Sequence, residues 1–122
     1  FGSYPSVIMG DFNAEEGSET YINVTKDFLD ARYETENSDF SKTYQNWGKT
    51  GKQLDYFMIS KTGFKVNSYD VLPATNEGGI YFSDHCPIVM EVALEGEFKK
   101  PEADKNLVDI LPEISLSGVI AK

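Results

Sequence analysis

Several residue types and patterns are scarce in this chain of 122 residues. Its single cysteine, Cys86, cannot form an internal disulfide. No apolar stretch approaches the roughly 20 residues that a membrane-spanning helix needs, and the chain does not open with a basic segment leading into an apolar one. We therefore expect a soluble chain without a visible signal peptide, and its length suits one domain with a core.

Basic side chains are also few. The chain has 11 Lys and Arg against 20 Asp and Glu, which gives a formal net charge of -9. Because nucleic-acid binding usually draws on clustered basic side chains, this composition disfavours a simple nucleic-acid-binding module. An acidic chain can still act on phosphates when a divalent cation bridges its carboxylates to the substrate, and that requires carboxylates placed together.

Hydrophobic patterning predicts several short strands and one helix. The apolar run 6–9 indicates a buried strand that stops at Gly10. Ser18 is a suitable N-cap for a helix over 18–29, where apolar residues recur at helical spacing. Further strands are expected at 42–47, 54–59, 64–72 and 87–94, and the loop between the last two is long enough to suggest a functional role.

The chain changes character after Leu94. A charged segment with Pro101 follows, and the end of the chain carries apolar residues from Leu107 to Ile120. We expect 1–95 to form one structural unit, and 96–122 to be a charged linker with an apolar tail of unknown role.

Three short motifs place polar side chains next to apolar runs. They are GDFN at 10–13, LDYFMIS at 54–60 and SDHCPIV at 83–89, which contains the only histidine. If the chain stays extended after the first strand, Asp11 and Asn13 share a face, although a strand-to-loop turn is an equal alternative. Asp55 at the start of an apolar strand calls for a partner, either functional or a structural salt bridge. Asp84 and His85 are neighbours and would point to opposite sides of an extended chain.

Taken in order, the three motifs resemble the carboxyl-terminal half of the endonuclease/exonuclease/phosphatase superfamily, whose fold is deoxyribonuclease I-like. The resemblance runs over residues 6–95, roughly three quarters of the chain. It implies an α+β fold, a β-sandwich with outer helices, of which this chain is about half. It also implies hydrolysis of phosphoesters, by a phosphodiesterase, nuclease or phosphatase, with Mg²⁺ or Mn²⁺ as cofactor.

The resemblance assigns roles to the residues of the motifs. His85 would be the base at the attacking water or an imidazole that contacts the phosphate, and Asp55 would hold its tautomer and orientation. Asp84 would belong to the metal shell. Asp11 would orient the water or assist the leaving group, and it would share the metal, while Asn13 would bind the phosphate as negative charge builds.

Aromatic residues near the motifs leave two interpretations open. Tyr44 and Trp47 could flank the substrate cleft, but large aromatic side chains more often belong to the core. Phe12, Cys86 and Pro87 are interpreted as structural.

The first half of such a domain has no counterpart in this sequence. We therefore expect the isolated chain to have little activity, and an uncovered apolar sheet face to cause self-association or to be covered by the tail 107–120. The substrate class stays open between nucleic acid, inositol phosphate and phospholipid head group, with the acidity favouring the smaller or lipid-type phosphates. The sequence context is similar to bacterial members of the family, several of which are exported.

Two other classes of function compete with a hydrolase. The chain could be a non-catalytic interaction module that keeps the fold, although the presence of every motif residue argues against such decay. It could also be an acidic Ca²⁺-binding protein, but no EF-hand spacing is present.

Overall fold

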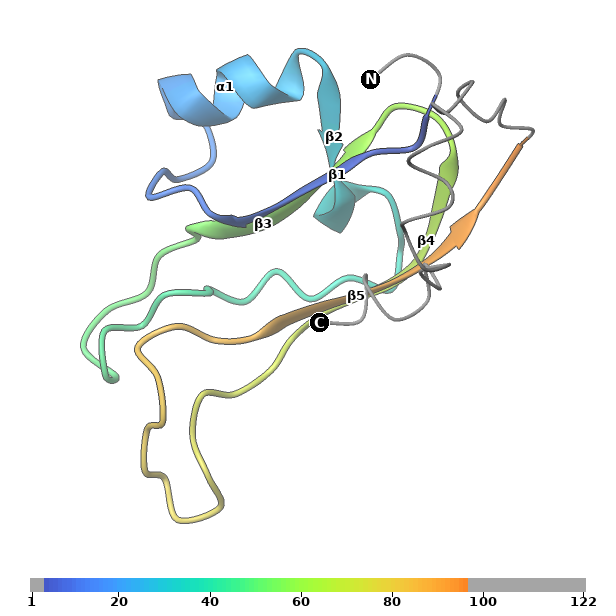
Figure 1. The fold of residues 1–122 in the computed structure, drawn as a ribbon. Coiled ribbons are helices and arrows are strands. Elements are labelled where there is room, and N and C mark those ends of the chain that lie inside the picture. The colour runs from blue at the N-terminus through green and yellow to red at the C-terminus, as the bar shows by residue number, and fades with distance from the viewer. Residues whose placement is uncertain (1–3, 97–122) are drawn as a thin grey trace, which may run out of the picture.

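The computed structural model describes residues 4–96, which form two antiparallel β-sheets and one α-helix (Figure 1). The expected α+β class is confirmed. The elements in chain order are β1 (Val7–Asp11), α1 (Glu19–Thr25), β2 (Phe28–Asp30), the 3-10 helix η1 (Ala31–Tyr33), β3 (Asp55–Ser60), β4 (Phe64–Val71) and β5 (Ile88–Leu94). No helix in this part of the chain is long and apolar enough to cross a membrane.

The strand β3 is the centre of the first sheet, whose order is β1-β3-β2. Both of its neighbours run antiparallel to it. Four consecutive side chains of β3, Tyr56 to Ile59, are buried, so both faces of this strand are covered. This explains why its sequence is a continuous apolar run rather than an alternating one.

The second sheet consists of β4 and β5 and packs against the first. Phe57 and Ile59 from β3 join Val66 and Tyr69 from β4 and Met90 from β5 in one buried cluster. Side chains of β4 alternate between buried and exposed, as expected for a strand with one face on the core. The two sheets therefore form the two layers of a sandwich with a shared core.

Three predicted elements differ from the structure. The first strand was expected to be buried and to stop at Gly10, but β1 continues to Asp11 and is exposed from Ile8 on, because it lies at the edge of its sheet. The helix ends at Thr25, and residues 28–30 form a strand because Phe28 and Leu29 pair with Ser60 and Ile59 of β3. The strand expected at 42–47 does not form. Positive φ angles at Asn46 and Trp47 bend the chain into a turn and leave only isolated bridges nearby.

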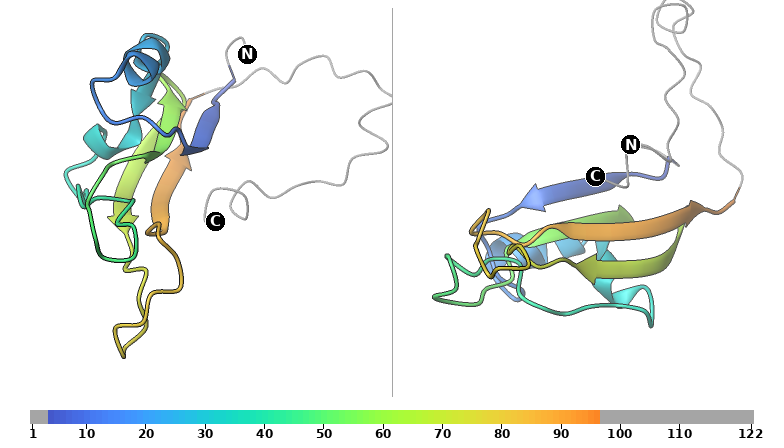
Figure 2. Two further views of the ribbon diagram at one scale, coloured as in Figure 1. Left: turned by 90° about the vertical axis from the view of Figure 1, so that its left-hand side faces the viewer. Right: turned by 90° about the horizontal axis from the view of Figure 1, so that it is seen from below.

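The three motifs meet at one end of the first sheet. Asp11 closes β1 and Asp55 opens β3, and the two residues are paired directly across the antiparallel ladder. The segment before β5, which carries His85, reaches the same end through a bridge to Tyr44. The long loop between β4 and β5 projects beyond the strands, as Figure 1 and the left-hand view of Figure 2 show.

Candidate active site

His85 and Asp55 form the centre of the site. The Nδ1 atom of His85 lies 2.8 Å from Oδ2 of Asp55, so a neutral imidazole donates its Nδ1 proton to this carboxylate. The other ring nitrogen, Nε2, then keeps its lone pair and lies 3.8 Å from Oδ2 of Asp11. The His85 side chain is 29% exposed, so Nε2 is within reach of a ligand. The structure thus brings the two motif residues into contact, and their roles in catalysis stay predictions.

Thr43 fixes the position of Asp55, and the sequence reasoning missed it. Its side chain is fully buried, and its hydroxyl accepts hydrogen bonds from the backbone N–H groups of Leu54, at 3.1 Å, and Asp55, at 3.0 Å. Its backbone carbonyl also accepts a bond from the N–H of Cys86. One residue therefore ties together the segments that carry Asp55 and His85. A single threonine in a polar run offers no local signal of this role.

Asn13 reaches the site by a different path from the one expected. Its φ angle of 48° shows that the chain does not stay extended after β1. Instead, its backbone N–H donates to Oδ1 of Asp11 at 2.7 Å, which is the turn given as the alternative. The turn occupies one oxygen of Asp11 and leaves Oδ2 facing His85.

A cleft of about 860 Å³ opens beside the imidazole. Its lining residues are Asn13, Ala14, Glu15, Ser18, Glu19, Thr20, Tyr44, Lys52, Leu54, Asp84 and His85. Tyr44 packs on the imidazole with ring centroids 5.0 Å apart. Trp47 is not among the residues that line this cleft and is half exposed on the turn, so the core alternative does not agree with the structure. Its place beside the substrate stays a prediction.

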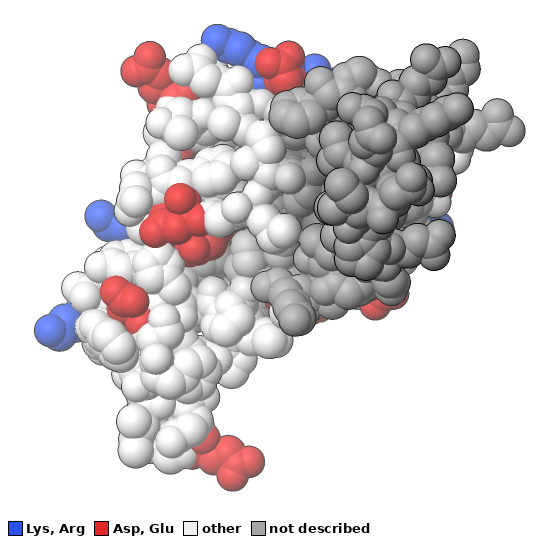
Figure 3. Space-filling model, in the orientation of Figure 1, with Lys and Arg blue, Asp and Glu red and all other residues white. Residues whose placement is uncertain are grey.

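Negative charge dominates the surroundings of His85. Partial burial is the largest single influence on the pKa of His85 and lowers it, whereas the hydrogen bond to Asp55 raises it. The charges of Asp55, Asp11 and Asp84 act in the same direction, so the pKa is raised above its ordinary value. On the face of the molecule that Figure 3 shows, acidic side chains form separate patches, and Lys and Arg side chains lie towards the margins.

The family model described as "Endonuclease/Exonuclease/phosphatase family" matches residues 2–85. The chain belongs to this family. The two-sheet architecture is accordingly part of the deoxyribonuclease I-like fold of the endonuclease/exonuclease/phosphatase proteins, as the sequence motifs indicated.

Two solved structures resemble this family member. A conserved protein of unknown function from Enterococcus faecalis V583 is 33% identical, with a TM-score of 0.65. The endonuclease/exonuclease/phosphatase from Bacteroides vulgatus is 23% identical with the same TM-score, and at this identity the likeness shows the fold alone. Each match covers 75% of this chain and 37% of the other chain, so the chain is a partial domain. A search of curated proteins found no match.

Members of the endonuclease/exonuclease/phosphatase family generally use divalent metals, and the site offers suitable ligands. One ligand atom from each of Asp11, Asp55 and His85 lies within 4.8 Å of the other two. The Oδ2 atom of Asp11 is the most available, because that of Asp55 is bonded to the imidazole. Carboxylate oxygens are the ligands that Mg²⁺ and Mn²⁺ favour, so the residues fit such an ion. Asp84 lies on the wall of the same cleft but outside this group of three, and its predicted role as a ligand stays a prediction.

Proposed function

We propose that this chain is the part of a divalent-metal-dependent phosphoester hydrolase that supplies the base for water attack. One observation carries the proposal: Asp55 holds the Nδ1 side of His85 while Nε2 faces an open cleft. A carboxylate that fixes one ring nitrogen and leaves the other free is the arrangement that general bases use. The negative surroundings would suit this role only beside a cation, since the phosphate of the substrate is itself anionic.

In this proposal, Nε2 of His85 takes a proton from water as the water oxygen attacks phosphorus. The bond from phosphorus to the leaving oxygen breaks, and that oxygen takes up a proton from solvent water. Asp55 stabilises the imidazolium that forms, and Asp11 accepts a hydrogen bond from the water. Asn13 donates its amide protons to a phosphate oxygen, and Tyr44 forms the wall against which the substrate packs. A Mg²⁺ or Mn²⁺ ion on Asp11 and Asp84 would neutralise phosphate charge.

The substrate is proposed to be a small or lipid-type phosphoester rather than a long nucleic acid. Lys52 is the single basic residue among those that line the cleft, against three acidic ones, Glu15, Glu19 and Asp84. A cleft of this composition offers little attraction to a run of phosphates. Both solved relatives come from bacteria, which supports a bacterial origin, and export from the cell stays a prediction.

The test is metal-dependent hydrolysis by the longer protein that contains this chain. We expect His85→Ala to lower kcat by about 10³-fold, because general-base catalysis contributes 10²- to 10⁴-fold. Asp70→Asn, which removes an exposed carboxylate on the far strand β4, is the matched control. Bis(4-nitrophenyl) phosphate and 4-nitrophenyl phosphate serve as the diester and monoester, each with Mg²⁺ or Mn²⁺ and with a chelator.

Two outcomes would reject the proposal. If the His85→Ala variant were as active as the native protein, His85 would not be the base. If the longer protein hydrolysed neither ester, the non-catalytic interaction module would be favoured. The isolated chain should show little turnover, because it spans only 37% of each solved relative. Turnover by the isolated chain at the rate of the parent would contradict that part of the proposal.

A further inference from the structure

The turn that follows Tyr44 has an unusual backbone. Asn46, Trp47 and Gly48 have φ angles of 46°, 57° and 82°, so three consecutive residues lie in the left-handed region. Glycine adopts this region readily, but it costs free energy for a residue with a side chain. Backbone strain of this kind persists only where the surrounding structure enforces it, and it gathers at functional sites. Contacts around the turn must therefore hold it.

Gln45 makes those contacts. Its side-chain oxygen, Oε1, accepts a hydrogen bond from the backbone N–H of Gly48 at 2.8 Å, across the turn. Its backbone carbonyl accepts bonds from the N–H groups of Lys49, at 2.9 Å, and Thr50, at 3.0 Å. One residue therefore accepts three of the hydrogen bonds that close the turn.

The same side chain also reaches the segment that carries Asp84 and His85. The Nε2 atom of Gln45 donates to the backbone carbonyl of Ser83 at 2.7 Å. The two bonds of the amide fix its orientation, because exchange of its oxygen and nitrogen would set donor against donor at Gly48 and acceptor against acceptor at Ser83. One side chain therefore joins the turn to this segment.

Backbone hydrogen bonds strengthen the connection. The carbonyl of Asp84 accepts bonds from the N–H groups of Gln45, at 3.0 Å, and Asn46, at 3.3 Å. The N–H group of His85 donates to Oγ of Ser83 at 3.1 Å. Because the carbonyls of Ser83 and Asp84 are both held, the peptide groups on either side of Asp84 have fixed orientations. These peptide groups determine the directions in which the side chains of Asp84 and His85 leave the backbone.

Asp84 depends on this anchoring more than His85 does. The imidazole of His85 is bonded to Asp55 and packs on the ring of Tyr44. The carboxylate of Asp84 lines the cleft but makes no hydrogen bond or ion pair within residues 4–96. Its direction is therefore set by its backbone, which the turn holds.

We propose that Gln45 is a positioning residue, which directs the carboxylate of Asp84 and the imidazole of His85 into the cleft. The left-handed turn serves to place the amide of Gln45 and two backbone N–H groups against the chain at Ser83 and Asp84. The consequence for catalysis rests on the proposed function, because Gln45 acts through Asp84 and His85, as contacts behind reacting groups do. The effect on the geometry of residues 83–85 does not rest on it.

Gln45→Glu and Gln45→Met separate the two bonds of the side chain. Glutamate has nearly the same shape and keeps an acceptor for Gly48 but loses the donor to Ser83, whereas methionine loses both. Amide hydrogen exchange of the 122-residue chain, followed by NMR, measures the result at single residues. We expect the amides of Asn46 and His85 to exchange about tenfold faster in both variants, the effect of one lost hydrogen bond. The amide of Gly48 should do so only in Gln45→Met, and the amides of β3 should keep their rates.

Steady-state kinetics of the longer protein measure the consequence for catalysis. We expect kcat to fall about 10- to 100-fold in both variants. KM should change little, because the displaced groups act on the reacting atoms. Lys49→Gln is the matched control, since it lowers the net charge by one, as Gln45→Glu does, on an exposed residue of the same turn. This control should keep the native kcat and the native exchange rates.

The outcomes separate this proposal from the proposed function. Faster exchange at Asn46 and His85, together with a longer protein that hydrolyses neither ester, would support the positioning role and reject the hydrolase. Unchanged exchange at these two amides would overturn the positioning role, and Gln45→Glu alone decides this if Gln45→Met fails to fold. An active longer protein whose kcat is unchanged in Gln45→Glu would also overturn it. So would a loss of kcat in Lys49→Gln as large as that in Gln45→Glu.

Discussion

Two aspartates of the first sheet, Asp30 on β2 and Asp55 on β3, are each paired with a basic side chain, and the two pairs differ in how completely they are enclosed. Arg32 and Asp30 are each 3% exposed, and Arg32 has Glu16 as a second partner. His85 and Asp55 are 29% and 16% exposed, and their 2.8 Å contact leaves Nε2 of the imidazole facing the cleft. The first pair is almost completely enclosed, and the second is open on one side.

The difference shows why similar contacts serve different purposes. In the enclosed pair, the Nε–H group of Arg32 is shared between the two oxygens of Asp30, which also accepts bonds from Nη2 of Arg32 and from the hydroxyl of Tyr21. This satisfies the carboxylate, so any change there leaves a buried charge unpaired. In the open pair, one ring nitrogen is uncommitted, so a change there should affect chemistry more than stability. The predictions below test this division.

The largest expected effect is on catalysis, through Asp55→Asn in the longer protein. An asparagine amide can donate to Nδ1 of His85 and shift the ring proton to Nε2, which removes the base. We expect kcat to fall by about 10²- to 10⁴-fold, with unfolding free energy changed by about 1 kcal/mol or less because the pair is partly exposed. Steady-state kinetics and urea denaturation measure the two effects. A large loss of stability with unchanged kcat would show that the pair of His85 and Asp55 is structural rather than catalytic.

In the enclosed pair, Arg32→Met should destabilise the chain strongly. The variant leaves the Asp30 carboxylate buried without its main partner, and breaking a buried pair costs about 3–5 kcal/mol. Urea denaturation of the 122-residue chain measures the loss. The double variant Asp30→Asn with Arg32→Met should recover part of it, because no unpaired charge remains. If Arg32→Met alone lowers the free energy of unfolding by less than about 1 kcal/mol, the pair of Arg32 and Asp30 does not stabilise the fold as proposed.

Thr43→Val sharpens the comparison, because Thr43 holds the open pair from within the core. The substitution keeps the shape of the side chain but leaves the N–H groups of Leu54 and Asp55 without their acceptor. Each buried unpaired group costs about 1–3 kcal/mol, and displacement of Asp55 should lower kcat as well. Thr43→Ser keeps the hydroxyl and is the matched control. If the two variants have the same stability and the same kcat, the hydroxyl of Thr43 does not hold Asp55 in position.

Alkaline pH should lower the stability of the chain through Tyr56, which packs beside the enclosed pair of Arg32 and Asp30. Burial raises the pKa of Tyr56 to about 12, and the ring lies 5.2 Å from the guanidinium carbon of Arg32. Below pH 10 the phenol is neutral in both folded and unfolded chains, so its contribution to stability is complete. Between pH 10 and about 12 only the unfolded chain ionises, so stability falls as pH rises. Phenolate absorbance with circular dichroism tests this, and Tyr56→Phe should reduce the pH dependence. If the phenolate signal that Tyr56→Phe removes appeared near pH 10 in the still folded chain, the prediction would be contradicted.

Much of the fold was predictable from the sequence because β1, β3, β4 and β5 have strong strand patterns. The strand β2 was not, since Phe28 and Leu29 also fall at helical spacing after Ser18, and only pairing with β3 decides between the two. Local spacing contains no information about that partner.

The site residues that belong to the three motifs were predictable from the sequence. The residues that hold them in position were not, because their contacts depend on the fold. The contact of Asp55 with His85 followed from the resemblance, although 30 positions separate them. The turn at Asn13 was one of two alternatives, and Thr43 had no signal, because its hydroxyl acts on a segment 11 and 12 positions away. The roles of all these residues in catalysis stay predictions.

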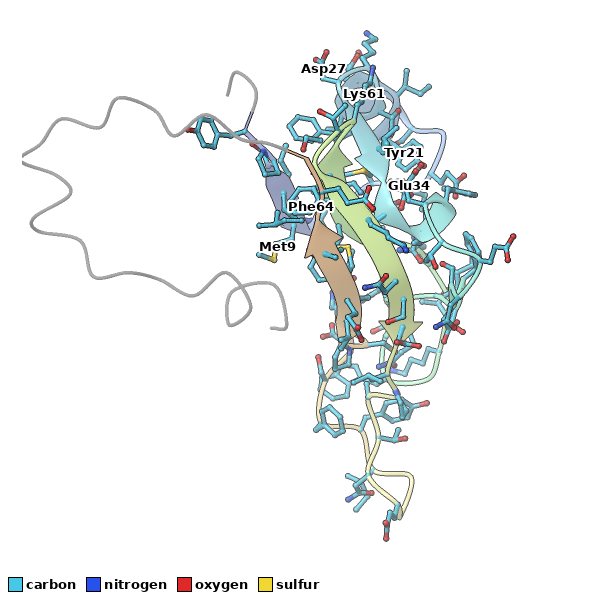
Figure 4. The ribbon with its side chains drawn as sticks, turned by 90° about the vertical axis from the view of Figure 1, so that its right-hand side faces the viewer. Met9, Tyr21, Asp27, Glu34, Lys61 and Phe64 are labelled. Carbon is cyan, nitrogen blue, oxygen red and sulfur yellow. The ribbon has the colours of Figure 1, made fainter. Side chains whose placement is uncertain are left out.

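The smallest expected effect concerns the apolar edge near the open pair. Ile8 and Met9 on β1 are 39% and 46% exposed. Within residues 4–96, β1 pairs only with β3 and β5 only with β4, so each has a free edge. Figure 4 places Met9 at the margin of the molecule on β1. Exposed edge strands with apolar side chains favour association, and we propose that the isolated chain forms a weak dimer through this surface.

Met9→Lys should weaken that dimer by about fivefold, since it removes part of a methionine's burial energy, about 1 kcal/mol. Ile22→Lys on α1 is the matched control, because Ile22 is 51% exposed on a different element. Sedimentation equilibrium over a range of concentrations measures both, and a chain ending at residue 96 tests the alternative that the tail 107–120, outside the described residues, covers the face. If the tail is the cover, the shortened chain dimerises more strongly than the full one. If both the full and the shortened chain are monomeric, the exposed apolar edge of β1 neither dimerises nor requires the tail to cover it. The imidazole of His85 is then the accessible binding feature of this end of the sheet.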